Sequence, residues 1–358
     1  MSNIAKQLSQ GLELAEGQVV LGLSEYRIGL RSNSHELLEK LGVYFAHTLD
    51  AGEPDIEVIA YETAPQDLGL DFIDWKREPG KTGRKDAYVD VEDGRLVQKV
   101  RTGMVFLQSE THRIAAGPCL ANDNQVINFI NAQYMNWLQN NGELICHASG
   151  LVVDARCLGI AGFSGGGKST LMLKVLDDDN VHYLTNDRLF IAKDNTHVRA
   201  TGIPKLPRIN PGTIVHNEKL KSILSPEQQE HFLSMPNEEL WHIEDKYDVD
   251  VEDVYGEGKI APTAKLKAFL VLNWTRDGET PCTFTQVDLA KRPELLERAI
   301  MKSPGPFYQF ADGSFLQDDM PLDPAPYLDM LKDIPIFEVS GTIDFDAATQ
   351  FCLEQMKG

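Results

Sequence analysis

The feature that most constrains this chain is a glycine-rich stretch, Gly162-Phe163-Ser164-Gly165-Gly166-Gly167-Lys168-Ser169, which satisfies the pattern G-x-x-x-x-G-K-[ST] in full. Ordinary residue frequencies produce such a match by accident in roughly one chain in a hundred of this length. Residues 157–163 (CLGIAGF) have the apolar character of a buried strand, and residues 169–176 (STLMLKVL) place apolar side chains at helical spacing. A strand, a glycine loop and a helix in this order predict a phosphate-binding loop and not a flexible linker.

Each residue type in the stretch has a physical reason to be there. Glycines let consecutive backbone N–H groups turn toward a phosphate chain without a Cβ in the way, and the following helix adds the partial positive charge of its N-terminus. Lys168 is expected to reach the β- and γ-phosphates, and the Ser169 hydroxyl is expected to ligate Mg²⁺. The predicted nucleotide-binding residues are Gly162, Ser164, Gly165, Gly166, Gly167, Lys168, Ser169 and Thr170.

A phosphate loop of this kind needs a carboxylate near the metal, normally at the end of a neighbouring strand. Residues 181–187 (VHYLTND) are typical of a strand, and it ends in Asn186 and Asp187. Asp187 follows Lys168 by 19 residues, and a helix of about ten residues covers about 15 Å, enough to return the chain to an adjacent strand end. We therefore predict Asp187 as the metal-facing carboxylate; the alternative is an aspartate that serves a turn or a cap.

Composition limits the other functions. The 358 residues are too many for one modest core and indicate two domains, and a formal net charge of −20 argues against nucleic-acid binding. No apolar run reaches 18 residues and the first residues are polar, so we expect no membrane span, no signal segment and a cytoplasmic protein. The five cysteines are scattered without a C-x-x-C pair, which argues against disulfides and structural zinc.

Periodicity predicts how the chain is organised. Residues 24–33 are expected to form a strand, residues 34–49 a helix with a capping arrangement of Asn33 and Glu36, and residues 87–100 a hairpin whose tight turn uses Asp93-Gly94. The apolar stripe of residues 123–142 predicts a helix. The predicted domains are an N-terminal α+β domain (1–122), a linking helix (123–142) and a catalytic domain (143–358).

Four segments together resemble a known family: ICHASG (145–150), GFSGGGKST (162–170), TNDRL (185–189) and GIPKLPRINPG (202–212). They are similar to the bacterial proteins called HprK-related kinase B, relatives of HPr kinase/phosphorylase, whose kinase domain shares a core with phosphoenolpyruvate carboxykinase. The matches span about 145–215. The resemblance implies an α/β fold: a P-loop kinase domain of the HPr-kinase and carboxykinase type, preceded by a smaller α+β domain.

The resemblance also implies ATP and Mg²⁺ as cofactors and transfer of phosphate to a serine. By position, His147 matches the histidine that the family carries upstream of the glycine loop; alternatively, it is a satisfied histidine of a half-buried strand. The expected catalytic residues are Asp187, His147, Lys168 and Arg208, and the expected metal ligands are Ser169, Asp187 and Asn186.

Two positions depart from the family pattern. The family's strand usually ends in two aspartates, and the first of them is Asn186 here, whose amide accepts a metal or a hydrogen bond but takes no proton. A family glutamate corresponds to His197. If a general base is needed, Asp187 or His147 must supply it.

Two further segments carry charge. Residues 201–213 hold Lys205 and Arg208 between prolines, which suits a rigid phosphate clamp, or else forms a solvated basic loop. The acidic run 244–259 is expected to contact a basic acceptor peptide or to be a solvated, mobile loop.

These residues predict an ATP-dependent kinase that transfers the γ-phosphate to a serine or threonine hydroxyl of a small protein or peptide. The alternatives are a small-molecule kinase or ATPase of the same fold, and a nucleotide-binding scaffold with little turnover. A homo-oligomer is compatible with the sequence, which does not identify the acceptor.

Overall fold

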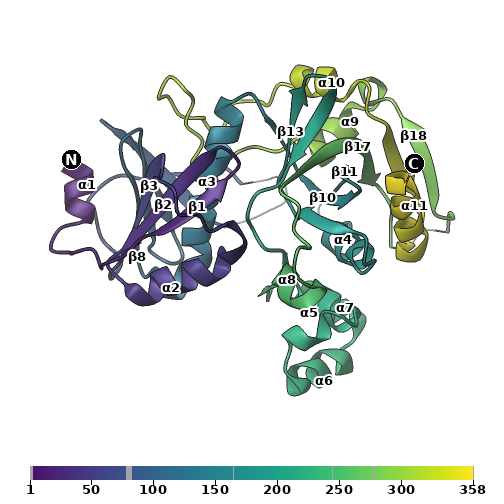
Figure 1. Cartoon of the computed structure of the whole chain (residues 1–358), viewed down its shortest axis with the longest axis horizontal. Coiled ribbons are helices and arrows are strands. Elements are labelled where there is room, and N and C mark those ends of the chain that lie inside the picture. The colour runs from purple at the N-terminus through teal and green to yellow at the C-terminus, as the bar shows by residue number, and fades with distance from the viewer. Residues whose placement is uncertain (1–2, 78–82, 164, 244, 277–278, 358) are drawn as a thin grey trace. The chain divides into compact units, whose positions relative to one another are not determined.

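The computed structural model describes residues 3–77, 83–163, 165–243, 245–276 and 279–357. The chain has an α/β fold with mixed sheets and divides into two compact units (Figure 1). Unit 1 comprises Met1–Gly142 and Ser303–Pro321, and unit 2 comprises Glu143–Lys302 and Leu322–Gly358. None of the helices in these described ranges combines the length and the apolar character that a membrane span requires.

Unit 1 is built on a mixed eight-stranded sheet in the order β1-β2-β3-β8-β7-β6-β5-β4. The β2–β3 and β3–β8 pairs are parallel and the other pairs are antiparallel. The strands are β1 (Val19–Leu23), β2 (Tyr26–Ser32), β3 (Ile56–Glu62), β4 (Ile73–Asp74), β5 (Asp86–Val91), β6 (Gly94–Lys99), β7 (Val105–Gln108) and β8 (Arg113–Gly117).

Three helices accompany this sheet: α1 (Asn3–Leu8), α2 (His35–Tyr44) and α3 (Asp123–Asn140). The predicted strand, helix and hairpin of this region are confirmed, but the predicted cap of α2 is wrong. Ser34 is the N-cap and accepts from the Leu37 N–H, because the Asn33 side chain is bonded to the backbone of Glu62 on β3.

The tight turn of the β5–β6 hairpin also differs from the prediction. Val91 pairs with Gly94, so the turn residues are Glu92 and Asp93, and neither they nor Gly94 have a positive φ. Gly94 is required for another reason: a Cβ there would lie 2.3 Å from the Gln108 carbonyl oxygen on β7.

Unit 2 is built on a nine-stranded sheet, in which β12-β10-β11-β17-β14-β13-β9 form the main path, β19 pairs with β17, and β18 pairs with β19. β11 and β17 run parallel, with Gly162 opposite Leu272. The strands are β9 (Leu144–Cys146), β10 (Ala148–Val153), β11 (Arg156–Gly162), β12 (His182–Thr185), β13 (Leu189–Asp194), β14 (His197–Thr201), β17 (Thr263–Leu272), β18 (Thr283–Val287) and β19 (Ile336–Ser340).

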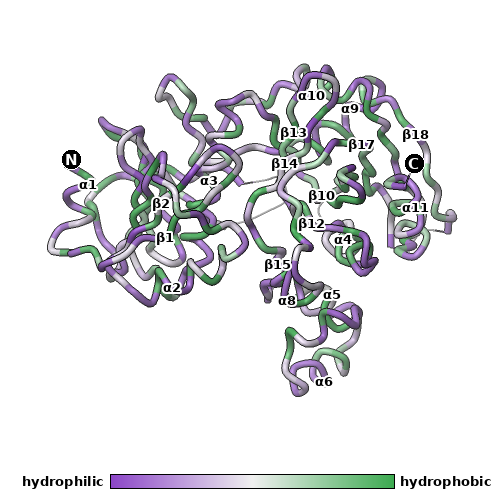
Figure 2. The backbone as a smooth tube through the Cα atoms, in the orientation of Figure 1, coloured by the Kyte–Doolittle hydropathy of each residue, from purple (hydrophilic) through white to green (hydrophobic). Residues whose placement is uncertain are grey.

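Alternating side chains of β17 serve the two faces of this sheet. Leu270 and Leu272 join the core that contains α4 (Lys168–Leu176) and α11 (Phe345–Lys357). Phe269 and Val271 join the core on the other face, with residues of α9 (Pro293–Leu295), the π-helical turn Leu296–Ile300 and α10 (Ala325–Leu331). Figure 2 shows the hydrophobic residues concentrated along the strands of this unit. Burial on both faces explains why residues 268–272 (AFLVL) form a continuous apolar run.

A small helical insertion separates β14 from β17 within unit 2. It contains β15 (Arg208–Ile209), α5 (Pro211–Val215), α6 (Pro226–Ser234), α7 (Asn237–His242), β16 (Tyr247–Asp248) and α8 (Val251–Tyr255). α6 begins with a capping box of Ser225 and Gln228. In Figure 1 the helices α5 to α7 extend away from the sheet of unit 2. The described part of the acidic run 244–259 thus forms ordered strand and helix in this insertion.

The two units differ from the predicted domain ranges. The helix 123–142 was expected as a linker, whereas α3 lies within unit 1, and residues 303–321 also belong to unit 1. Residues 303–321 join unit 1 because the fully buried Arg95, which pairs with Asp90, donates to the Leu316 carbonyl oxygen (2.7 Å). A contact this distant along the chain leaves no periodic signal in the sequence.

Candidate active site

The loop from Gly162 to Lys168 joins the end of β11 to the start of α4. Gly165 and Gly167 have φ of 78° and 82°, a left-handed conformation that glycine adopts without strain. A Cβ on Gly162 would lie 2.8 Å from the Cβ of Leu272, whereas a Cβ on Gly165 would meet nothing within 4 Å. One end of the loop is therefore tightly packed and its middle is open. Ser164, which was predicted to bind nucleotide, lies outside the described residues.

The N-terminus of α4 is suited to an anion. Gly167 is its N-cap and carries no side chain to cap the helix, and the first helical bond runs from the Leu171 N–H to the Gly167 carbonyl oxygen (2.9 Å). α4 spans nine residues, enough for the amides of its first turn to present partial positive charge. The predicted helix 169–176 is confirmed, with Lys168 added at its start.

Three groups converge on the carboxylate of Asp187, just after β12. Lys168 Nζ lies 2.9 Å from Asp187 Oδ1, and His147 Nε2 lies 3.1 Å from the same oxygen. Lys302 Nζ lies 3.3 Å from Asp187 Oδ2. Asp187 is half-exposed, while the Lys168 and Lys302 side chains are only 11% and 14% exposed. The structure thus brings together three of the four predicted catalytic residues and adds a second lysine.

The local charges set the protonation of this cluster. Burial alone would raise the pKa of Asp187, but Lys168 and Lys302 hold it well below its usual range, so Asp187 is ionised at neutral pH. Burial lowers the pKa of His147, the hydrogen bond that the imidazole donates to Asp187 opposes this, and the two lysines lower the pKa further. His147 is consequently neutral at pH 7 and is the better proton acceptor of the two.

His147 occupies a break in the sheet that the sequence did not indicate. β9 ends at Cys146 and β10 begins at Ala148, so His147 lies between the two strands. The backbone N–H of His147 donates to the Ile300 carbonyl oxygen (2.6 Å), and His147 takes no part in the pairing of β9 or β10. That break turns the imidazole toward Asp187.

Asn186 lies beside the serine of the loop. Ser169 Oγ donates to Asn186 Oδ1 (2.9 Å), and Ser149 Oγ of β10 donates to the Asn186 carbonyl oxygen. A hydroxyl and an amide oxygen this close fit the oxygen preference of Mg²⁺, which also keeps waters and takes phosphate oxygens in nucleotide sites. Three groups already contact the two oxygens of Asp187, so its capacity to ligate a metal increases when a lysine moves to phosphate.

The proline-rich segment adds cationic groups to the same region. Burial, followed by the charges of Arg188, Arg208 and Lys302, lowers the pKa of Lys205 to about 7. Arg208 was predicted to be catalytic; its guanidinium pairs with Asp248 (3.0 Å) across the β15–β16 ribbon. Lys168 and Lys302 contact Asp187 directly, in a chain of strongly negative net charge.

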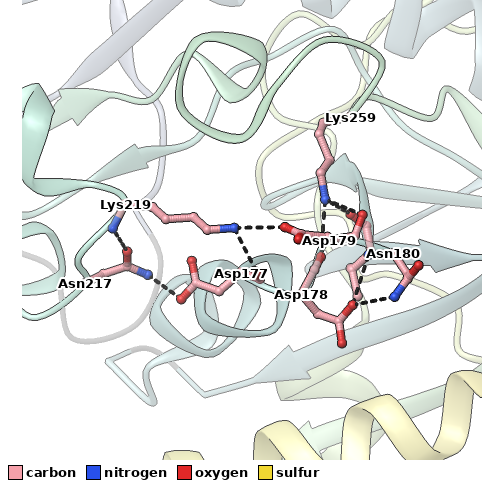
Figure 3. A network of polar contacts seen from close by, with 8 residues as sticks. Asp177, Asp178, Asp179, Asn180, Asn217, Lys219 and Lys259 are labelled. Carbon is pink, nitrogen blue, oxygen red and sulfur yellow. Dashed lines mark hydrogen bonds and ion pairs between the residues drawn. The ribbon is translucent and has the colours of Figure 1, made fainter.

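The helical insertion forms hydrogen bonds at both ends of α4. Thr213 of α5 and Thr170 share a hydroxyl hydrogen bond of 2.9 Å at the N-terminal end. At the C-terminal end, Figure 3 shows Lys219 directed at Asp177 and Asp179, and Lys259 directed at Asp178 and Asp179. Lys259, which is 7% exposed, donates to the carbonyl oxygens of Asp178 (3.2 Å), Asp179 (2.9 Å) and Val181 (2.9 Å). Two cations at the C-terminus of α4 stabilise its dipole and hold the insertion to the loop helix.

Sequence reasoning missed Lys302, and it also missed Lys219 and Lys259, which hold the helical insertion to the end of α4. Lys302 is 115 residues from Asp187, and its sequence signal is weak, a lysine directly before Ser303-Pro304-Gly305. His197, which replaces a family glutamate, begins β14 and lies 4.0 Å from Asp194 Oδ2.

Comparisons with known proteins give a distant structural likeness. No family model matches the chain, and no curated protein matches it. Among solved structures, the Hpr(Ser) kinase/phosphatase from Coxiella burnetii matches with a TM-score of 0.28 and 10% identity, over 59% of this chain and 87% of that chain. A likeness at this TM-score does not establish a shared fold by itself, and the site is defined by the side chains described above.

Proposed function

We propose that unit 2 is an ATP-dependent phosphotransferase that moves the γ-phosphate to a serine or threonine hydroxyl of a small protein or peptide. The observation that carries this proposal is the convergence of Lys168, Lys302 and His147 on Asp187 beside the N-terminus of α4. The glycine loop would hold the phosphate chain by its backbone amides, and Lys168 and Lys302 would exchange Asp187 for phosphate oxygens.

Magnesium fits the neighbouring oxygens. Ser169 Oγ and Asn186 Oδ1 would hold it together with phosphate oxygens, and Asp187 becomes available as its lysines turn to the nucleotide. When bound, magnesium neutralises phosphate charge in the transition state of such transfers.

The remaining steps belong to the side chains of the chain itself. Asp187 and His147 would orient the acceptor hydroxyl; its oxygen bonds to the γ-phosphorus, the bond from that phosphorus to the β–γ bridging oxygen breaks, and ADP leaves with the electron pair. The hydroxyl proton would pass to the Asp187–His147 pair; neutral His147 donates its Nε2–H to ionised Asp187, so Nδ1 is the nitrogen that can accept this proton. Phosphoryl transfer depends mostly on positioning and charge neutralisation, so one carboxylate suffices for a slow reaction.

Incubation with γ-labelled ATP and Mg²⁺ in a lysate of the source organism tests this function. The proposal predicts a labelled acceptor that mass spectrometry identifies as phosphorylated on serine or threonine, and loss of the label with Lys168→Ala. Label transferred only to a small molecule would favour a metabolite kinase instead.

Asn186 favours a second candidate, a nucleotide-binding scaffold with little turnover. With an amide in place of a carboxylate, Asp187 is the acidic member of the cluster around Lys168, and two lysines hold it. In that case ATP binds, while hydrolysis and transfer stay at background in both the wild type and Asn186→Asp.

A further inference from the structure

A tryptophan outside the cluster around Asp187 is hydrogen-bonded to the backbone of the glycine loop. Trp274 follows β17 by two residues, and its side chain is almost fully buried. Its indole Nε1–H donates to the Gly166 carbonyl oxygen at 2.7 Å.

The bond fixes the direction of a particular amide. The peptide between Gly166 and Gly167 is trans and planar, so its N–H points opposite to its carbonyl group. With the Gly166 carbonyl directed at Trp274, the Gly167 N–H is directed away from Trp274. An acceptor bond at the carbonyl also polarises the N–H of the same peptide and makes it a stronger donor.

A second ring closes the same side of the loop. Phe345, the first residue of α11, packs edge to face on Trp274 with ring centroids 5.2 Å apart. A Cβ on Gly167 would lie 2.7 Å from Phe345 Cζ, so the ring abuts the backbone of that glycine. Three consecutive glycines give the free loop many backbone conformations, and these contacts select one of them.

We propose that Trp274 is a positioning residue of the phosphate-binding loop, whose indole N–H orients the Gly167 amide toward the phosphate chain of the nucleotide. This inference rests on the proposed function of the loop. Because the Gly167 amide would contact phosphate in both the ground state and the transition state, Trp274 acts on nucleotide affinity and KM and not on kcat.

Removal of the N–H tests the inference. Trp274→Phe keeps a ring against Phe345 and removes the donor, and β-(3-benzothienyl)alanine at position 274 keeps the bicyclic shape as well. From the usual net value of a neutral hydrogen bond, we expect MgATP affinity to fall about 2- to 12-fold in calorimetric titration, with kcat changed less than twofold. Trp137→Phe, which alters a ring stacked on Tyr26 in unit 1, is the matched control and should bind as the wild type does.

The outcomes separate the two proposals. Weaker binding by both position-274 variants, with kcat retained, supports the positioning role. Equal affinity of the wild type and the benzothienyl variant, or a fall in kcat alone, overturns that role and leaves the proposed function intact. A wild type that binds no MgATP overturns both.

Discussion

The pH dependence of nucleotide affinity should report the protonation of Lys205. Burial and three neighbouring cations lower its pKa to about 7 from a usual value near 10.5, so the ligand-free protein loses this proton as the pH rises through about 7. A bound phosphate chain favours the charged form and restores the pKa toward its usual value. Binding above pH 7 therefore takes up a proton, and affinity must fall as the pH rises.

The size of the effect follows from that pKa. The protonated fraction of Lys205 in the ligand-free protein falls from about one quarter at pH 7.5 to about one hundredth at pH 9, so MgATP affinity should fall roughly 25-fold over this interval. Phosphate groups, with a second pKa of ~6, and His147, with a lowered pKa, have already lost their protons in this interval.

Calorimetric titration in buffers of different ionisation enthalpy provides the assay. At pH 8.5 the observed enthalpy should increase with buffer ionisation enthalpy at a slope near one proton taken up. Lys205→Arg, which stays charged, should bind with little pH dependence and no proton uptake, and Lys205→Met should bind weakly at every pH. A wild-type affinity that does not change between pH 7.5 and 9, or an equal fall in Lys205→Met, would refute the reasoning.

Three further substitutions test other parts of the site. Lys302→Met removes a charged donor; because Asp187 is half-exposed we expect about a tenfold loss of MgATP affinity, and a loss under twofold would exclude Lys302 from phosphate binding. Asn186→Asp adds a carboxylate beside the loop serine, so less Mg²⁺ should support half-maximal turnover and kcat should rise; unchanged background turnover would instead favour the scaffold. Lys259→Met removes the donor that three backbone carbonyls share, of which Asp178 keeps a second bond from the Val181 N–H, and urea unfolding should show a loss of about 1–3 kcal/mol. Lys221→Met, which breaks an exposed pair with Glu218, should cost under about 1 kcal/mol and serves as the control for both lysine substitutions.

Local patterns predicted the part of the site that is local in sequence. The strand, loop and helix from Arg156 to Leu176 follow from apolar periodicity and glycine placement. The short helix also explains why Asp187 returns to Lys168. Turn chemistry was less informative: the capping residue is Ser34, since a tertiary hydrogen bond occupies Asn33.

The rest of the site depends on contacts between distant segments. Lys302 reaches Asp187 because the segment after the π-helical turn passes beside β9, where Met301 bridges Cys146. Lys259, near the C-terminal end of the helical insertion, contacts the residues that directly follow α4. Neither arrangement leaves a periodic trace in the sequence, so the sequence alone does not indicate the roles of these two lysines.

Calorimetric titration of MgATP into the full-length wild type and Lys168→Ala examines the nucleotide site itself. Binding of one nucleotide per chain by the wild type, weakened at least about tenfold by Lys168→Ala, is the expected result, because a charge-assisted contact to phosphate is lost. No heat and no thermal shift with the wild type, or equal affinity of the two proteins, would contradict a phosphate-binding role for residues 162–170.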